Sequence, residues 1–137
     1  MDNESKNSLA IIRIESADEL LNDARNLLKS KSYKSANNRA FYSAEKSIKA
    51  ALALKEKDSK SHSGVIHLFN SEFILNKSRF FDHDDLILLK NMDLVRTASD
   101  YDDFYLASKK DTIKQITDAE IICNKVKEYL KSEKVII

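Results

Sequence analysis

Apolar side chains recur at intervals of three and four residues along most of the chain, with polar and charged residues between them. This spacing is typical of helices that bury one face. It predicts five helices: one over about 5–30, one over about 33–55, a third that ends at about 76, a fourth that begins within 82–85 and ends at about 100, and a fifth from about 108. Because the links between them are short, these helices suit an all-α, antiparallel up-and-down bundle.

Local residue types refine the ends of these helices. Ser61 or Ser63 is expected to cap the third helix and Ser108 the fifth, because a serine oxygen accepts a hydrogen bond from a free backbone N–H group at such a position. Ser16 and Glu19 have the spacing of a capping box, which would allow a break in the first helix. We favour one continuous helix there.

Composition narrows the fold and excludes two functional classes. The chain has no proline and one glycine, Gly64, so it lacks the residues that form tight turns and phosphate-binding loops. Dinucleotide-binding and P-loop sites are therefore excluded. A chain of 137 residues fits a single domain, 1–137, with a core that spans about residues 5–132.

The single cysteine, Cys123, can neither form an intramolecular disulfide nor supply a cysteine metal cluster, which favours a reducing compartment. It lies among apolar residues and is expected to be buried. The N-terminal segment lacks the apolar region of a cleavable signal, and no apolar run approaches the ~20 residues that span a bilayer. We therefore expect a cytoplasmic protein with no membrane contact.

Charge is balanced over the whole chain, with 23 basic and 22 acidic residues, but it is unevenly distributed. Residues 29–60 carry nine bases and three acids, whereas residues 82–103 carry seven acids and two bases. Such asymmetry favours docking onto another chain or a second copy, although two unrelated solvated faces would give the same pattern. The apolar tail, residues 134–137, is either frayed or in contact with a partner. The balanced total gives no reason to expect DNA specificity.

Three short motifs follow one another along the chain: NRAFY at residues 38–42, SHSGV at residues 61–65 and RTASDY at residues 96–101. In order and spacing, over about residues 15–130, they resemble HEPN-domain proteins, and more narrowly the small stand-alone HEPN proteins of bacteria and archaea. The resemblance implies a helical bundle that is commonly a homodimer. It also implies a minimal nucleotidyltransferase partner, which in some systems forms a toxin–antitoxin pair with the HEPN protein.

The resemblance further implies a type of active site, from which this chain departs. Many HEPN proteins are metal-independent ribonucleases in which an arginine is followed four to six residues later by a histidine, with the site assembled across the dimer. Here no histidine follows Arg96. Cleavage without a metal needs a general base, for which neutral imidazole is suited near pH 7, whereas the carboxylate of Asp100 is a poor base there. His62 would serve only if the fold carried it to Arg96.

The surviving Arg96 is a planar, permanently charged donor that suits a phosphate. Asp100 lies one helical turn later, so the alternative to phosphate contact is an intrahelical ion pair between the two. Asn38, Arg39 and Tyr42 form a polar patch on the second helix. This patch would either line a cleft against the fourth helix, where Arg96 lies, or form a hydrogen-bonded seam that fixes helix register.

Four other residues could take part in binding or packing, and the sequence gives a simpler expectation for each. Tyr101 follows the arginine motif and would stack on a base, accept a nucleotide covalently as the resemblance implies, or cover the end of the bundle. Covering the bundle is the role expected for Phe104, and His67 is expected to be half-buried. His83 is followed by two aspartates, a spacing that does not converge on a metal ion, so we expect no metal site and no cofactor.

These observations lead to one hypothesis and two alternatives. The hypothesis is a dimeric HEPN protein that acts with a nucleotidyltransferase partner, binds nucleotide or RNA phosphate, and lacks the usual Arg/His ribonuclease activity. The alternatives are an active metal-independent endoribonuclease with His62 as a relocated base, and a purely structural interaction module. The candidate residues are Arg96, Asp100 and Tyr101 for catalysis, and Asn38, Arg39, Tyr42 and Arg96 for phosphate binding.

Overall fold

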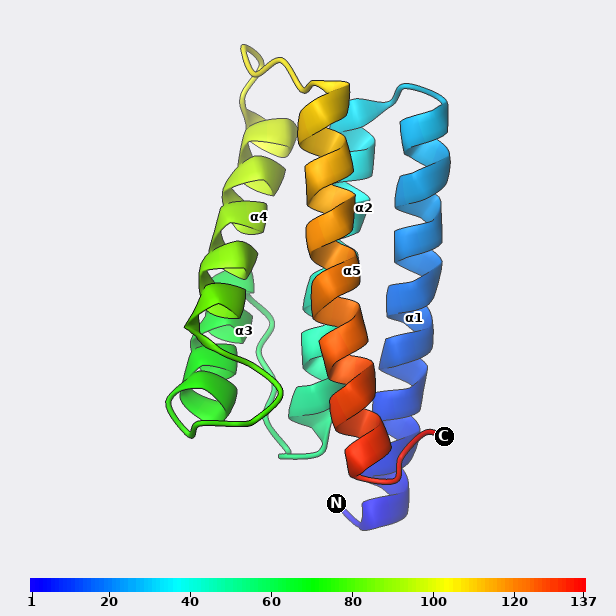
Figure 1. The fold of residues 1–137 in the computed structure, drawn as a ribbon, viewed down its shortest axis with the longest axis vertical. Helices are drawn as coiled ribbons and strands as arrows, with labels where there is room; N and C mark the ends of the chain where they lie inside the picture. The colour runs from blue at the N-terminus through cyan, green and yellow to red at the C-terminus, as the bar shows by residue number, and fades with distance from the viewer.

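The computed structural model describes all 137 residues, and its regular elements are all helical. The elements are α1 (Asn3–Lys29), α2 (Tyr33–Ala53), α3 (His62–Phe69), α4 (His83–Tyr101) and α5 (Lys109–Ser132). The four long helices alternate in direction, and both chain ends lie at the same end of the bundle (Figure 1). The predicted all-α bundle of about five helices is therefore confirmed. None of the helices is both long enough and apolar enough to cross a membrane.

Capping side chains mark the starts of several helices. Ser61 precedes α3 and Ser108 precedes α5, and each accepts a hydrogen bond from the backbone N–H three residues later, as the sequence predicts. Asp82 and Asp85 form a reciprocal capping box at the start of α4, within the predicted aspartate cluster. Local sequence therefore determines where these three helices begin.

The structure differs from the predicted pattern in two places. The third helix ends as an α-helix at Phe69, and a π-helical turn, η1 (Asn70–Ile74), follows it. The helical segment as a whole therefore ends at Ile74, about two residues before the predicted end. The tail is not simply frayed, because Val135 and Ile136 pack against the core of their own chain, whereas Ile137 is exposed. The first helix runs without a break, because its buried residues follow one face on both sides of the Ser16 position (Ala10, Ile14, Ala17, Leu21 and Ala24).

Helix α2 is the centre of the bundle and packs against α1, α3, α4 and α5. Eight of its twelve buried residues are alanine or serine, which allow neighbouring helices to approach closely. Ser43, which is fully buried, lies between α1 and α5: its hydroxyl donates to the Ala17 carbonyl at 2.7 Å and contacts the Cys123 sulfur at 3.4 Å. The expected burial of Cys123 is confirmed.

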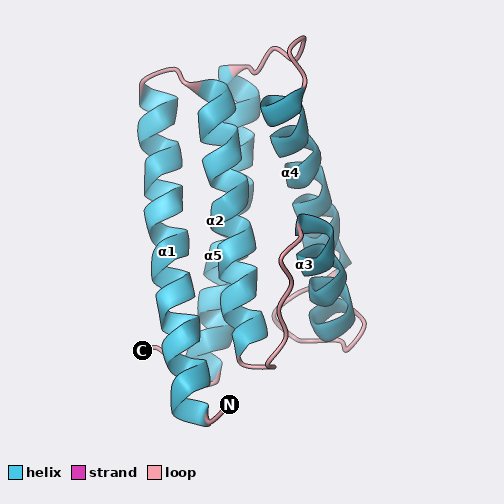
Figure 2. Cartoon of the chain, turned by 180° about the vertical axis from the view of Figure 1, so that it is seen from behind, coloured by secondary structure: helices cyan, strands magenta, loops and turns pink.

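Helix α4 lies on the other side of the bundle from α1, with α2 and α5 between them (Figure 2). Helix α3 packs against α2 and α4. An aromatic cluster fixes the segment around it, with the rings of Phe69, Phe73 and Phe81 5.2–6.2 Å apart. The polar part of α2 that faces neither α1 nor α5 is thereby placed beside α4 and α3, and the candidate site lies there.

Candidate functional site

The side chain of Arg96 is buried in a network formed mainly by its own helix. Only 6% of the residue is exposed. Its Nε and Nη2 donate to Asp93 Oδ1 at 3.1 and 2.8 Å, Nη2 also donates to Thr97 Oγ1 at 3.0 Å, and Nη1 donates to Asp100 Oδ2 at 3.4 Å. The predicted ion pair with Asp100 is therefore present. The stronger contact, to Asp93 one turn earlier, was not anticipated from the sequence.

The guanidinium of Arg96 also lies over an aromatic ring, with its Cζ 5.3 Å from the centre of Phe41 on α2. Burial is the largest influence on the pKa of Arg96 and lowers it, but the hydrogen bond and charge of Asp93 and the hydrogen bond of Asp100 outweigh burial. The pKa of Arg96 is therefore raised. Arg96 thus remains charged at any physiological pH, and its charge is compensated by carboxylates within the protein.

Asp100 connects this arginine to α2. Its Oδ1 accepts a hydrogen bond from Asn38 Nδ2 at 2.8 Å, and Asn38 Oδ1 in turn accepts one from Arg39 Nη1 at 2.9 Å. A continuous network therefore runs from Asp93 through Arg96 and Asp100 on α4 to Asn38 and Arg39 on α2. The structure brings together four of the six candidate residues from the sequence, namely Arg96, Asp100, Asn38 and Arg39. The other two, Tyr42 and Tyr101, form no hydrogen bond in this network.

A small hollow between α2 and α4 adjoins the network, and we call it the polar hollow. Its volume is about 160 Å³, and no apolar residue lines it. The lining residues are Lys34, Ser35, Asn38, Arg39, Ser99 and Asp100. Two cations face one carboxylate there, and that carboxylate is already paired with Arg96. The polar hollow is therefore suited to an anion with several oxygen acceptors.

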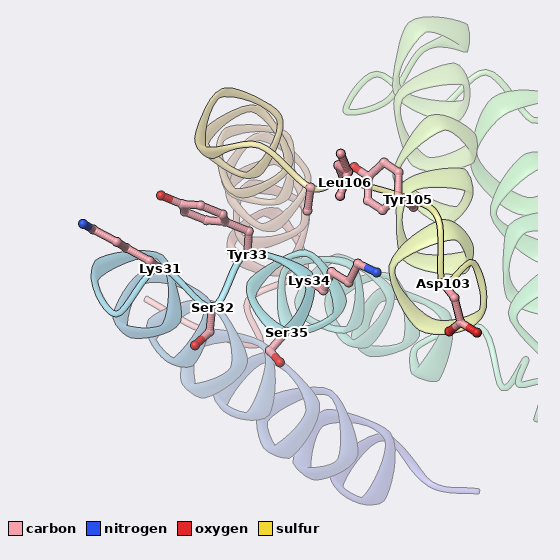
Figure 3. A pocket seen from close by; sticks show the side chains of 9 residues that line it. Lys31, Ser32, Tyr33, Lys34, Ser35, Asp103, Tyr105 and Leu106 are labelled. Atoms are coloured by element: carbon pink, nitrogen blue, oxygen red, sulfur yellow. The ribbon is translucent and has the colours of Figure 1, made fainter.

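A larger hollow, of about 400 Å³, lies at the same end of the bundle (Figure 3). It shares Lys34 and Ser35 with the polar hollow but includes neither Arg96 nor Asp100. Size alone would favour it as the functional site. We place the candidate site at the polar hollow instead, because the hydrogen-bonded network of α2 and α4 lines only that one.

His62, at the start of α3, lies in the same region. Its Nδ1 is within hydrogen-bond distance of Glu45 Oε2 on α2, and its ring lies 5.3 Å from that of Phe41 and 5.6 Å from that of Tyr42. The Arg96 Cζ and the His62 ring centre are no more than about 11 Å apart, because each is 5.3 Å from the centre of the Phe41 ring. The fold therefore brings His62 near the arginine without direct contact.

Besides Asp93, two further residues near the site are not among those that the sequence analysis predicts. Glu45 is one of them. The sequence does hold a signal for it, because Asn38, Tyr42 and Glu45 have the i, i+4, i+7 spacing of one helix face. Asn37, next to the predicted patch, is fully buried and donates to Ser99 Oγ at 3.2 Å. It thereby couples α2 to Ser99 of α4, which lines the polar hollow.

Two expectations about exposure are wrong, and the structure also gives the exposure of Tyr101. Phe104 is 93% exposed, so the expectation that it covers the bundle end is wrong, and the neighbouring Tyr105 is the half-buried residue instead. His67 is exposed on the outer face of α3 rather than half-buried. Tyr101 is 76% exposed at the end of α4 and takes no part in the arginine network. No group of three or more potential metal ligands occurs in the structure.

Known proteins match this chain over most of its length, including the helices that form the candidate site. The HEPN domain matches residues 11–129 of the chain. The Methanocaldococcus jannaschii protein "Putative toxin MJ0142" is 32% identical over 123 residues, which are 90% of this chain and 82% of the relative. A second protein of that organism, "Putative toxin MJ0605", is 34% identical over 119 residues, 86% of each chain. A "UPF0332 protein" of Archaeoglobus fulgidus is 29% identical over 123 residues, 90% of this chain and 96% of the relative.

Replacing the buried arginine tests whether it holds the network together. Arg96→Met keeps the packing against Phe41 but leaves Asp93 and Asp100 without their cation, so we expect the free energy of unfolding to fall by about 1–3 kcal/mol. Urea unfolding measures the change. Lys90→Met, on the exposed side of the same helix, is the matched control and should change stability by less than about 0.5 kcal/mol. Equal stability of the two variants would show that the network contributes nothing to folding.

Proposed function

The chain belongs to the HEPN family, and from this membership and the polar hollow we propose that it is a toxin-like protein that binds a phosphate group of RNA or of a nucleotide. The observation that carries the proposal is the lining of the polar hollow by Lys34, Arg39 and Asn38 next to a compensated carboxylate. Cationic and neutral hydrogen-bond donors both contact phosphate oxygens in proteins, and this lining supplies both.

The roles of the individual residues follow from their contacts. Arg39 is exposed and Lys34 half-buried, so both are accessible to a ligand. Arg96 already donates four hydrogen bonds, which leaves one of its five N–H groups free. In this proposal Arg39 and Lys34 contact the phosphate directly. Arg96 compensates Asp100 and so prevents that carboxylate from repelling the anion.

The proposal includes binding without the usual HEPN cleavage. No histidine follows Arg96, and Asp100 is occupied by Arg96 and Asn38. The group that would take the proton of a ribose 2′-hydroxyl is therefore missing from the position where the family motif places it.

A second candidate function is metal-independent RNA cleavage, and the pairing of His62 with Glu45 favours it. A carboxylate that accepts a hydrogen bond from one imidazole nitrogen leaves the other nitrogen oriented to take a proton. His62 and Arg96 each lie 5.3 Å from the centre of the Phe41 ring, and this closeness supports the alternative in which His62 is a relocated base.

We further infer that the protein forms a homodimer and acts with a nucleotidyltransferase. Ile87, Leu94 and Tyr101 follow one another at seven-residue intervals on α4, and all three are exposed. Such spacing places them on one face, which forms an apolar stripe suited to contact between helices of two chains. Tyr101 is 76% exposed in the single chain, which supports its modification by a nucleotidyltransferase partner before two chains associate.

Removing one cation from the polar hollow tests phosphate binding. We expect Arg39→Gln to weaken the binding of a fluorescein-labelled single-stranded RNA about fivefold, because one charge-assisted phosphate contact is lost. Fluorescence anisotropy in EDTA measures the dissociation constant. Lys131→Gln, which alters an exposed residue in the last turn of α5, is the matched control and should bind as the wild type does. Unchanged affinity of Arg39→Gln would contradict the proposal.

Cleavage separates the two candidate functions. We expect the wild-type protein to leave a mixed RNA substrate intact in EDTA, as judged by denaturing gel electrophoresis. Cleavage by the wild type that is lost in both His62→Asn and Glu45→Gln would replace the first candidate by the second. Cleavage that persists in both variants would contradict both assignments.

The dimer is tested through the exposed stripe. Leu94→Lys places a charge in its middle and should convert the protein from dimer to monomer, as measured by light scattering after size-exclusion chromatography. Ile12→Lys alters a similarly exposed apolar residue on α1 and serves as the control. A monomeric wild type, or a Leu94→Lys variant that remains dimeric, would rule out this interface.

A further inference from the structure

The larger hollow continues from the polar hollow around the start of α2. The two share Lys34 and Ser35, so a ligand in one hollow is adjacent to a ligand in the other. The larger hollow is bounded by the link between α1 and α2, by the first turn of α2, and by residues 103–107 in the link between α4 and α5 (Figure 3). It is open to solvent at the end of the bundle, and a chain could enter it from the polar hollow.

Cations and aromatic rings line this hollow together. Lys31 and Lys34 form no ion pair, and Lys34 Nζ lies 6.0 Å from the centre of the Tyr105 ring. Tyr33 supplies a second aromatic ring. The only carboxylate, Asp103, lies on the α4 side, across the hollow from Lys31 (Figure 3). Sites for single-stranded nucleic acid combine cations for the backbone with aromatic faces for the bases in this way.

The first turn of α2 adds to the preference for an anion. Ser32 precedes the helix but makes no side-chain capping hydrogen bond, and the first turn contains no acidic residue. The backbone N–H groups at the positive end of the helix dipole are thus not occupied by a side chain of the cap. Ser32, Tyr33, Lys34 and Ser35 all line the larger hollow, so this helix end borders it.

We propose that the larger hollow is a second nucleotide subsite for single-stranded RNA. This inference rests on the proposed function, because it takes the phosphate in the polar hollow as the start of the bound strand. Lys34, common to both hollows, contacts the phosphate that joins two neighbouring nucleotides, and the next base stacks on Tyr33. A base within a duplex is already stacked and paired, so only an unpaired strand can place its base there.

A length series of RNA ligands tests the subsite. The probes are 5′-phosphorylated adenosine oligonucleotides of one to four nucleotides, which compete with a labelled single-stranded RNA in an anisotropy assay. For the wild type we expect at least a tenfold gain in affinity between one and three nucleotides. Tyr33→Leu should reduce this gain at least fivefold, because stacking on an aromatic face is lost, and should leave the affinity for one nucleotide unchanged.

Two further variants keep the test independent of changes at the start of α2. Lys31→Gln alters an exposed side chain in the link before the helix, and it should lower the slope of log affinity against log salt by about one for three nucleotides only. Phe104→Leu removes an exposed aromatic ring at the same end of the bundle that does not line the hollow. It should retain the full gain with length.

The outcomes distinguish this inference from the proposed function. If Arg39→Gln weakens every length while Tyr33→Leu and Lys31→Gln retain the gain with length, the subsite is wrong and the phosphate site stands. If Tyr33→Leu weakens one nucleotide as much as three, the hollow holds free nucleotides and the RNA subsite is overturned. If duplex RNA competes as well as single strands of the same length, the requirement for an unpaired base is wrong. If no length competes, the proposed function itself fails.

Discussion

Close packing around α2 is the constraint on which the rest of the structure depends. Its alanine and serine residues let α1 and α5 approach closely, and the hydroxyl of Ser43 satisfies a carbonyl of α1 within that contact. With those faces filled, the remaining side of α2 is covered by α3 and α4. Polar residues on that side are therefore placed in a boundary between helices rather than in open solvent, which is where a binding site can form.

The pairing of charges where α2 packs against α4 determines which kind of ligand can bind there. The basic segment 29–60 contains α2 and the acidic segment 82–103 contains α4, so the two segments meet within one chain where these helices pack together. The acidic side uses two carboxylates to hold Arg96, whereas the basic side leaves Arg39 and Lys34 next to a hollow. The surplus of positive charge at the hollow arises because the nearest carboxylate is already engaged.

The sequence predicts the local features of this protein better than the contacts between helices. The starts of α3 and α5 were predictable because Ser61 and Ser108 act on their own backbone. The pair of Arg96 and Asp100 was predictable because both lie on one helix at a fixed spacing. Asp93 and Glu45 were not identified, because their importance depends on how each helix is rotated against its neighbours. The π-helical turn after Phe69 likewise has no local signature in the residues that form it.

The buried cysteine has a consequence for following the motions of this bundle. Cys123 belongs to α5 and contacts Ser43 of α2. Burial is the largest influence on the pKa of its thiol and raises that pKa. A thiol of this kind is almost entirely protonated near neutral pH and is shielded from reagents while the helices stay together. The rate at which an alkylating reagent modifies the native protein is therefore limited by how often α2 and α5 separate. The chain thus contains a natural label that reports core opening without any engineered probe.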